Sequence, residues 1–118
     1  MKTIAVIIST PPYGHEMSRE GLDAILALSS YSEAVSVFFI ADGIYQLIEN
    51  QNAEQMGLKQ HTSMYKLFEL YDIESCFVLA TDLKLRNIEL SQLMINVSPL
   101  TIAEYHQALS ACELKLKF

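Results

Sequence analysis

Long apolar runs are absent from this sequence. No stretch approaches the roughly 20 apolar residues that span a bilayer, and the N-terminal segment Met1 to Ile8 lacks the small-residue cleavage site of a signal peptide. We therefore expect a cytosolic protein. Its 118 residues are typical of one domain, so we predict that residues 1–118 form a single domain.

Cysteine is also scarce. Only Cys76 and Cys112 occur, and neither lies in a C-x-x-C pair or at metal-ligand spacing from a histidine. A reducing cytosol keeps thiols from forming structural disulfides. His15, His61 and His106 are dispersed, with no spacing that brings two of them onto one helical face. The sequence therefore predicts neither a disulfide nor a metal site.

Positive charge is the third deficit. Eight Lys and Arg residues stand against fourteen Asp and Glu residues, which gives a formal net charge of −6. Nucleic-acid binding depends largely on Lys and Arg that neutralise phosphates. We expect no direct nucleic-acid contact, and if RNA takes part in the function, another subunit holds it.

The apolar pattern predicts strands and helices in alternation. Continuous short apolar runs typical of buried strands, and one closing segment, predict strands at Lys2–Ser9, Ala34–Ile40, Cys76–Leu79, Leu93–Val97 and Leu114–Phe118. Helical spacing or capping residues predict helices from Ser18 to near Tyr31, from Asp42 to Ile48, from Thr62 to Tyr71, from Thr81 to about Arg86, and after Thr101. Glu49–Gln60 is a polar surface loop.

Alternating strands and helices predict an α/β fold with a five-stranded parallel sheet between two helical layers. Capping residues support the helices: Ser18, Asp42 and Thr81-Asp82 stand at predicted N-termini, and Thr101 with Glu104 fits a capping box. Ligands of such sheets bind at the carboxyl ends of the strands. The loops to examine are therefore Ser9–His15, Ala41–Tyr45 and Leu79–Asp82.

The loop Ser9–His15 contains one glycine and two prolines, so it is neither a P-loop nor a dinucleotide-binding fingerprint, and no cofactor is expected. Thr10, His15 and Asp42 mark a candidate cleft for a small anionic ligand. The simpler interpretation of Asp42 is a helix cap.

Hydrophobic residues make up 51% of the chain, which is rich for a domain of this size. Either a subunit interface is buried, or both faces of the sheet are covered by helices. Ile44, Tyr45 and Leu47, after the second strand, are candidate interface residues. The alternative is that they only cover the sheet.

Three segments carry a resemblance to a known family: Arg19–Ala24, Phe38–Leu47 and Leu70–Cys76. They resemble the TusC-like, DsrF-related members of the DsrE/DsrF family, nearly end to end, and Phe-Phe-Ile-Ala-Asp-Gly is the most specific part. The resemblance implies a five-stranded parallel sheet and a sulfur relay that supports 2-thiolation of the tRNA wobble uridine, in 5-methylaminomethyl-2-thiouridine synthesis. It also implies TusB-like and TusD-like partners in a dimer of heterotrimers.

In that family the TusD-like chain carries the sulfur-accepting cysteine after its third main strand, and the matching position here is Leu79. Because leucine cannot accept sulfur, the resemblance implies a non-catalytic structural subunit, with Cys76 at most an auxiliary thiol. Two alternatives remain. One is a thiol-dependent sulfurtransferase that uses Cys76 or Cys112, and the other is an unrelated α/β module that binds a small ligand.

Overall fold

The computed structural model describes residues 3–11, 17–30, 34–48, 68, 73 and 75–118. These residues contain a five-stranded parallel sheet in the order β4-β3-β2-β1-β5. The strands are β1 (Thr3–Ile8), β2 (Ala34–Phe39), β3 (Cys76–Leu79), β4 (Ser98–Leu100) and β5 (Leu114–Lys117). The predicted five-stranded parallel sheet is confirmed.

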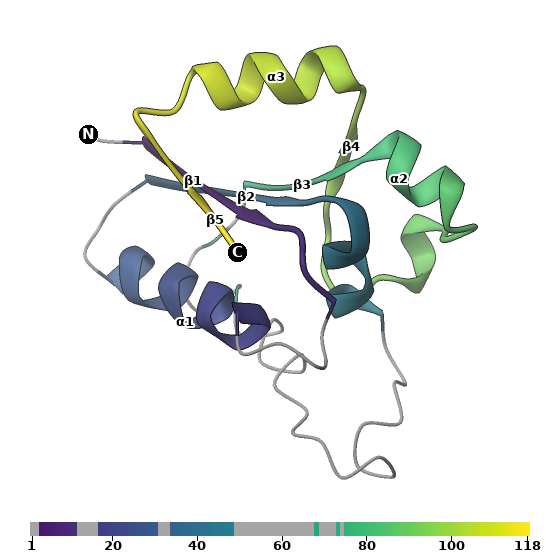
Figure 1. Ribbon diagram of the computed structural model, residues 1–118, viewed down its shortest axis with the longest axis horizontal. Helices are drawn as coiled ribbons and strands as arrows, with labels where there is room; N and C mark the ends of the chain where they lie inside the picture. The colour runs from purple at the N-terminus through teal and green to yellow at the C-terminus, as the bar shows by residue number, and fades with distance from the viewer. Residues whose placement is uncertain (1–2, 12–16, 31–33, 49–67, 69–72, 74) are drawn as a thin grey trace, which may run out of the picture.

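Helices lie on both faces of this sheet. They are α1 (Met17–Ser30), the 3-10 helix η1 (Ala41–Leu47), α2 (Ala80–Leu85), the short 3-10 helix η3 (Leu90–Gln92) and α3 (Ile102–Ser110). Figure 1 shows α1 and η1 on one face and α3 on the other, with α2 beyond the end of β3. The predicted three-layer arrangement is therefore confirmed.

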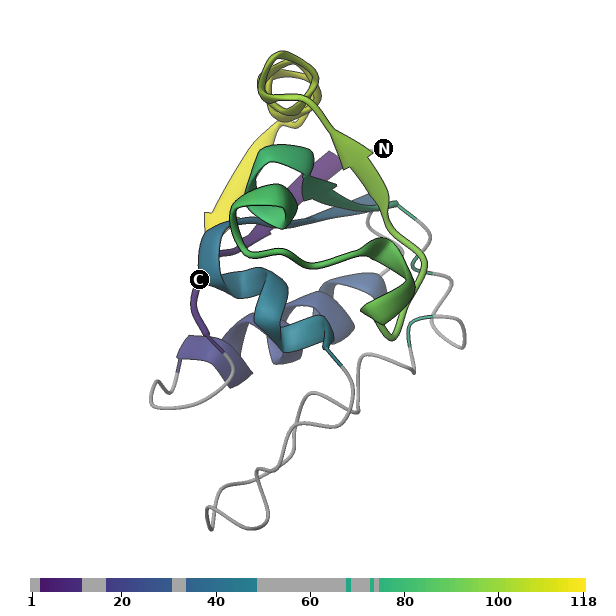
Figure 2. The ribbon, with the colours of Figure 1, turned by 90° about the vertical axis from the view of Figure 1, so that its right-hand side faces the viewer.

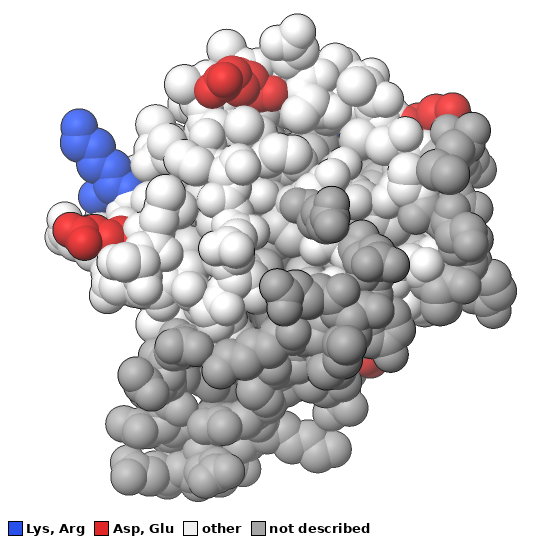
Figure 3. All heavy atoms as spheres, turned by 180° about the vertical axis from the view of Figure 1, so that it is seen from behind, with Lys and Arg blue, Asp and Glu red and all other residues white. Residues whose placement is uncertain are grey.

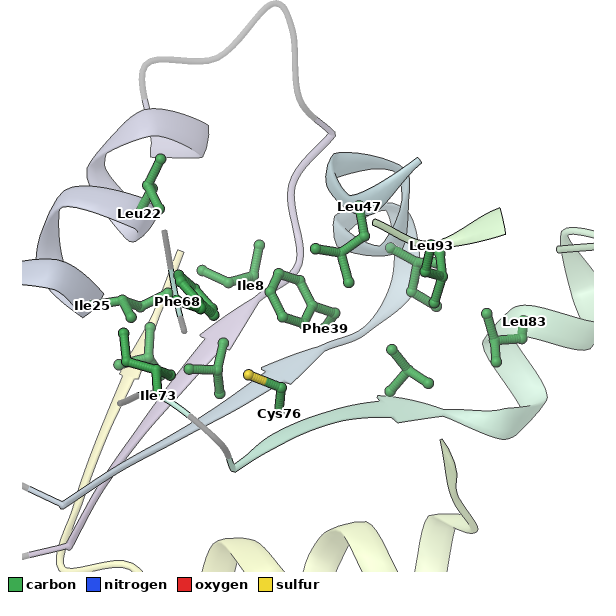
Figure 4. Close-up of a cluster of buried hydrophobic side chains, with 14 of the residues drawn as sticks. Ile8, Leu22, Ile25, Phe39, Leu47, Phe68, Ile73, Cys76, Leu83 and Leu93 are labelled. Atoms are coloured by element: carbon green, nitrogen blue, oxygen red, sulfur yellow. The ribbon is translucent and has the colours of Figure 1, made fainter. Parts of the chain in front are cut away.

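The buried side chains form two clusters, one on each face of the sheet. Along β1, Ile4, Val6 and Ile8 face α1 and η1, whereas Ala5 and Ile7 face α3. The larger cluster, toward α1 and η1, is drawn in Figure 4. In the smaller cluster, the Phe38 ring stacks on Phe77 with centroids 5.2 Å apart and meets Tyr105 edge-on at 5.6 Å. A strand buried on both faces explains why its apolar run does not alternate.

The prediction for the fourth strand was wrong, because β4 spans Ser98–Leu100 and not Leu93–Val97. Leu93 forms an isolated antiparallel bridge with Ile48, and the Met94 N–H donates to the Leu47 carbonyl at 2.8 Å. The apolar residues from Leu93 to Val97 pack against the edge of the larger cluster. Their apolar character therefore reflects packing and not strand pairing.

Two other predicted elements lie outside the described residues: the loop Glu49–Gln60 and most of the helix Thr62–Tyr71. Within that helix only Phe68 is described, and it is buried in the larger cluster. Ser18 lies inside α1 and not before it. In the described part of the chain, no helix is long and apolar enough to cross a membrane.

The predicted capping box at the start of α3 is confirmed. The Glu104 N–H donates to Thr101 Oγ1 at 3.1 Å, and the Thr101 N–H donates to Glu104 Oε1 at 2.9 Å. The hydrogen bond from the Thr101 N–H, together with the Thr101 side chain, lowers the pKa of the Glu104 carboxyl. Each residue satisfies a backbone donor that the helix leaves unpaired.

Gly43 allows η1 to lie directly against the end of β1. A β-carbon at this position would stand 2.0 Å from the Ile8 carbonyl oxygen, a backbone atom that cannot rotate away. We expect Gly43→Ala to lower the free energy of unfolding by at least about 1–3 kcal/mol, because overpacking here displaces a strand. Urea denaturation followed by circular dichroism measures the loss.

Gly21→Ala is the matched control. A β-carbon there would meet Ile8 Cδ1 at 2.6 Å, which is the end of a flexible side chain. It would also add a better helix former to α1. A loss for Gly21→Ala equal to that of Gly43→Ala would contradict the assignment of the cost to the β1 backbone.

Candidate functional site

Hydrogen bonds join the carboxyl ends of β1 and β2 to each other and to η1. The Ile40 N–H, after β2, donates to the Ile8 carbonyl at 3.0 Å. The buried Gln46 side chain in η1 donates from Nε2 to the Thr10 carbonyl at 2.8 Å. Thr10 Oγ1 is buried and has no hydrogen-bond partner among the described residues. This edge of the sheet is thus a packed junction of η1 with the end of β1.

Asp82 caps η1 across the sheet edge. Ala41, the first residue of η1, has a left-handed φ of 49°, and its N–H donates to Asp82 Oδ2 at 2.8 Å. The predicted caps at Asp42 and at Thr81-Asp82 are therefore wrong. Asp42 lies inside the first turn of η1, whose N-cap residue is Ile40, and α2 begins at Ala80, before Thr81 and Asp82. The carboxylate that accepts a hydrogen bond from the Ala41 N–H belongs to Asp82, which lies in the first turn of α2 after the end of β3.

Arg86 joins the two carboxylates. Its Nη2 donates to Asp42 Oδ1 at 3.1 Å, and its Nη1 lies 3.5 Å from Asp82 Oδ1 and 3.3 Å from the Asp82 carbonyl. Its guanidinium carbon lies 6.0 Å from the centre of the Tyr45 ring. We call Asp42, Tyr45, Asp82 and Arg86 the ion-pair cluster. Sequence reasoning missed it, although the i, i+4 spacing of Asp82 and Arg86 was the available signal.

The ion-pair cluster is unsuited to an anionic ligand. One guanidinium stands between two carboxylates, so the residual charge is negative and opposes an anion. Of the predicted cleft residues, Asp42 is bound by Arg86 and Thr10 accepts a hydrogen bond from Gln46 through its carbonyl. His15, the third predicted cleft residue, lies outside the described residues.

Both thiols are buried, on opposite faces of the sheet. Cys76, the first residue of β3, is 4% exposed within the larger cluster, where Figure 4 shows its sulfur among apolar side chains. Burial raises the pKa of this thiol from 9.0 to about 12. Cys112 lies in the smaller cluster, its Sγ donates to the Ala108 carbonyl at 3.5 Å, and burial raises its pKa as well. Neither is a ready thiolate, the form that attacks sulfur.

Leu79 is the last residue of β3 and immediately precedes α2. It is half-buried against the smaller cluster. A cysteine at such a strand end would face the amides of the following turn, where a thiolate is stabilised. The leucine side chain offers no nucleophile there.

The candidate interface residues are only partly at the surface. Ile44 and Leu47 are fully buried in the larger cluster and therefore offer no surface to a partner. Tyr45 is half-buried beside them. The 3-10 helix covers the sheet, which was the alternative.

No histidine cluster is formed by the described residues. His106 is exposed on α3, with its ring centroid 5.4 Å from that of Tyr105. His61, like His15, is outside the described residues. Within the described ranges, no group of three or more His, Cys, Asp or Glu side chains is arranged to hold a metal ion.

Comparison with known proteins identifies the family of this chain. A sequence model of the DsrE/DsrF-like family matches residues 2–118. The chain belongs to the DsrE/DsrF-like family. The crystal structure of the ychN protein from E. coli is similar to this DsrE/DsrF-like chain, with a TM-score of 0.84 and 20% identity over 100% of both chains. That likeness shows a shared fold.

The two carboxylates of the ion-pair cluster should contribute unequally to stability. The Asp82 side chain is 18% exposed and accepts from the Ala41 N–H, whereas Asp42 is 56% exposed and meets only Arg86 in the described contacts. We expect Asp82→Ala to cost about 1–3 kcal/mol, because the Ala41 donor loses its partner. Asp42→Ala, the control, should cost about 0–1 kcal/mol in the same urea titration. Equal losses would contradict the capping role of Asp82.

The thiol of Cys76 should be unreactive in the folded chain. We expect alkylation by iodoacetamide to be slow near pH 8 and to become fast in denaturant, with mass spectrometry locating the label. Because folding raises this pKa, the neutral thiol stabilises the fold fully below about pH 9, and this stabilisation is lost as the pH rises toward about 12. Rapid native labelling of Cys76 would contradict its place in the core.

Proposed function

We propose that the chain is a TusC-like, non-catalytic subunit of a cytoplasmic sulfur-relay complex that supports 2-thiolation of the tRNA wobble uridine. Its partners in this proposal are TusB-like and TusD-like chains, in a dimer of heterotrimers. Membership of the DsrE/DsrF-like family supports the connection with sulfur chemistry. The finer assignment depends on the motifs around Arg19–Ala24 and Phe38–Leu47.

The observation that carries the proposal is the absence of a usable nucleophile at the carboxyl end of β3. Leu79 occupies that end, and both thiols are buried in the core. In a sulfur relay, an acceptor thiolate attacks the outer sulfur of a donor persulfide, and the donor leaves as a thiolate. Neither cysteine of this chain is exposed to act as the donor or the acceptor of sulfur, so in this proposal the exchanging cysteines belong to other subunits.

The contribution of a non-catalytic subunit is geometric. Persulfide exchange requires donor and acceptor sulfurs to be aligned and protected from competing thiols. The Asp82 cap and the Gln46 hydrogen bond hold η1 against α2 and the end of β1, so these hydrogen bonds fix the position of the surface at this edge. Such a surface can support a partner's relay site without taking part in bond formation.

Native mass spectrometry of the complex purified gently from its own cells tests the assignment. We expect this chain to co-purify with two sister chains of the same family, one of which carries the mass of one extra sulfur atom. This chain should carry none. A chain isolated without sister subunits would refute the proposal, and sulfur on this chain would favour the sulfurtransferase alternative.

Replacing both cysteines distinguishes a structural subunit from a thiol-dependent sulfurtransferase in cells. A strain that lacks this gene is complemented with the chain that carries Cys76→Ala and Cys112→Ala, and 2-thiouridine in tRNA is measured. A structural subunit should restore the wild-type level when the variant reaches equal abundance. Loss of thiolation at equal abundance would indicate that one of the two thiols takes part in transfer.

A further inference from the structure

The 3-10 helix η1 begins with a backbone conformation that its sequence does not favour. Ala41 has a φ of 49°, in the left-handed region where a β-carbon crowds the following carbonyl oxygen. For a residue other than glycine, this strain lowers the population of the conformation roughly 5- to 30-fold. The helix is also seven residues long, whereas 3-10 helices rarely exceed three or four. Contacts from other elements must therefore hold η1 in place.

The first turn of η1, Ala41–Gly43, is held from outside the helix. Its own N-cap residue makes no side-chain hydrogen bond to it. The Ala41 N–H instead donates to Asp82 Oδ2 at 2.8 Å, and Asp42 Oδ1 accepts from Arg86 at 3.1 Å. Figure 2 faces this side of the molecule and shows η1 beside α2, the helix that carries Asp82 and ends at Arg86.

The second half of η1 is held independently, by uncharged groups. Ile44 and Leu47 are fully buried in the larger cluster. The Gln46 side chain donates to the Thr10 carbonyl at 2.8 Å, and the Leu47 carbonyl accepts from the Met94 N–H at 2.8 Å. None of these contacts is made by a residue of α2. The first turn can therefore lose its contacts with α2 while the second half stays in place.

We propose that Ala41–Gly43 is a strained gate at the carboxyl edge of the sheet, which Asp82 holds closed and which opens without unfolding the rest of the chain. Strain favours the opening, because Ala41 returns to an ordinary conformation once its N–H leaves Asp82. Gly43 lies at the boundary with the anchored half, where a residue without a β-carbon can absorb the change in backbone angles. The inference goes beyond the proposed function and does not depend on it.

Opening of this gate changes the charge at the edge of the sheet. In the closed turn, Arg86 lies between the carboxylates of Asp42 and Asp82. When the turn opens, Asp42 moves away with it, and Arg86 keeps only the carboxylate of its own helix. On the described part of the face seen from behind, by contrast, charged groups are few and separate (Figure 3). The closed gate therefore opposes an anion beside the end of β3, and the open gate opposes it less.

Amide hydrogen exchange of the purified chain, measured for each residue by NMR at low urea concentrations, tests the gate. Local opening exposes little surface, so its exchange depends weakly on urea, whereas exchange through global unfolding depends strongly on it. The Met94 N–H reports on the anchored half of η1, because it donates to Leu47. We expect protection factors at Ala41 and Gly43 to be at least about tenfold lower than at Met94, with weak urea dependence.

Two variants should move the gate in opposite directions. Asp82→Ala should speed exchange at Gly43 at least about fivefold, because the Ala41 N–H loses a charged acceptor. Ala41→Gly should slow it about two- to fivefold, because the strain that is relieved exceeds the extra freedom that glycine has in the open turn. The double variant should regain part of the protection that Asp82→Ala loses.

Glu104→Ala is the matched control, because it removes the capping box of α3 and leaves α2 intact. It should speed exchange at the start of α3 and leave Gly43 unchanged.

Equal protection and equal urea dependence at Gly43 and Met94 would overturn the proposal, because the turn would then open only with the whole chain. An Ala41→Gly variant that exchanges at Gly43 as fast as the wild type, or faster, would also overturn it, because Ala41 would then store no strain. This second variant keeps the test decisive if Asp82→Ala does not fold.

Discussion

The described fold depends first on the strand β1, which pairs with β2 and β5 and packs against α1. It is hydrogen-bonded to β2 along Thr3–Ile8 and to β5 along Ile4–Ile7, and its side chains are buried on both faces. The interactions continue past its end, where the Ser9 N–H donates to the Phe118 carbonyl at 2.8 Å and the Ile40 N–H reaches the Ile8 carbonyl. Because parallel strands end at the same edge, Leu79 and Asp82 lie beside these junctions. The chemistry of that edge follows from the pairing of β1.

The burial of the thiols limits what this chain can do within a sulfur relay. A thiol that stays neutral in an apolar core is a poor nucleophile, and to react it would have to leave the core or admit a partner sulfur into it. Both are costly in a close-packed interior, where Cys76 lies among the side chains of Figure 4. Under the proposed function, sulfur is therefore handled by other subunits, and this chain contributes the strand ends against which η1 is fixed.

Features that depend on residues close together in the sequence were predicted correctly, whereas contacts between residues far apart in the sequence were missed. The strands β1, β2 and β3 were placed correctly to within one residue at each end because continuous apolar runs mark buried strands. The closing strand β5 was placed equally well, although Lys115 and Lys117 interrupt its apolar residues. The capping box of α3 was found because Thr101 and Glu104 are three residues apart. The cap of η1 was missed because Ala41 and Asp82 are 41 residues apart and meet only in the folded chain. Likewise, apolar character alone could not show that Ile44 and Leu47 point inward.

A parallel sheet of five strands always has two edges, and this chain treats them in opposite ways. The β5 edge carries two lysines, so a close approach there brings positive charges together. The β4 edge has no charged residue from Leu90 to Ala103, and Leu90 and Ile102 are exposed there. The β4 edge is instead restrained by its length and by Pro99, since a strand of three residues with one missing N–H offers little for another strand to pair with. The two edges are therefore protected against sheet extension by different means, charge at β5 and a short, proline-containing strand at β4.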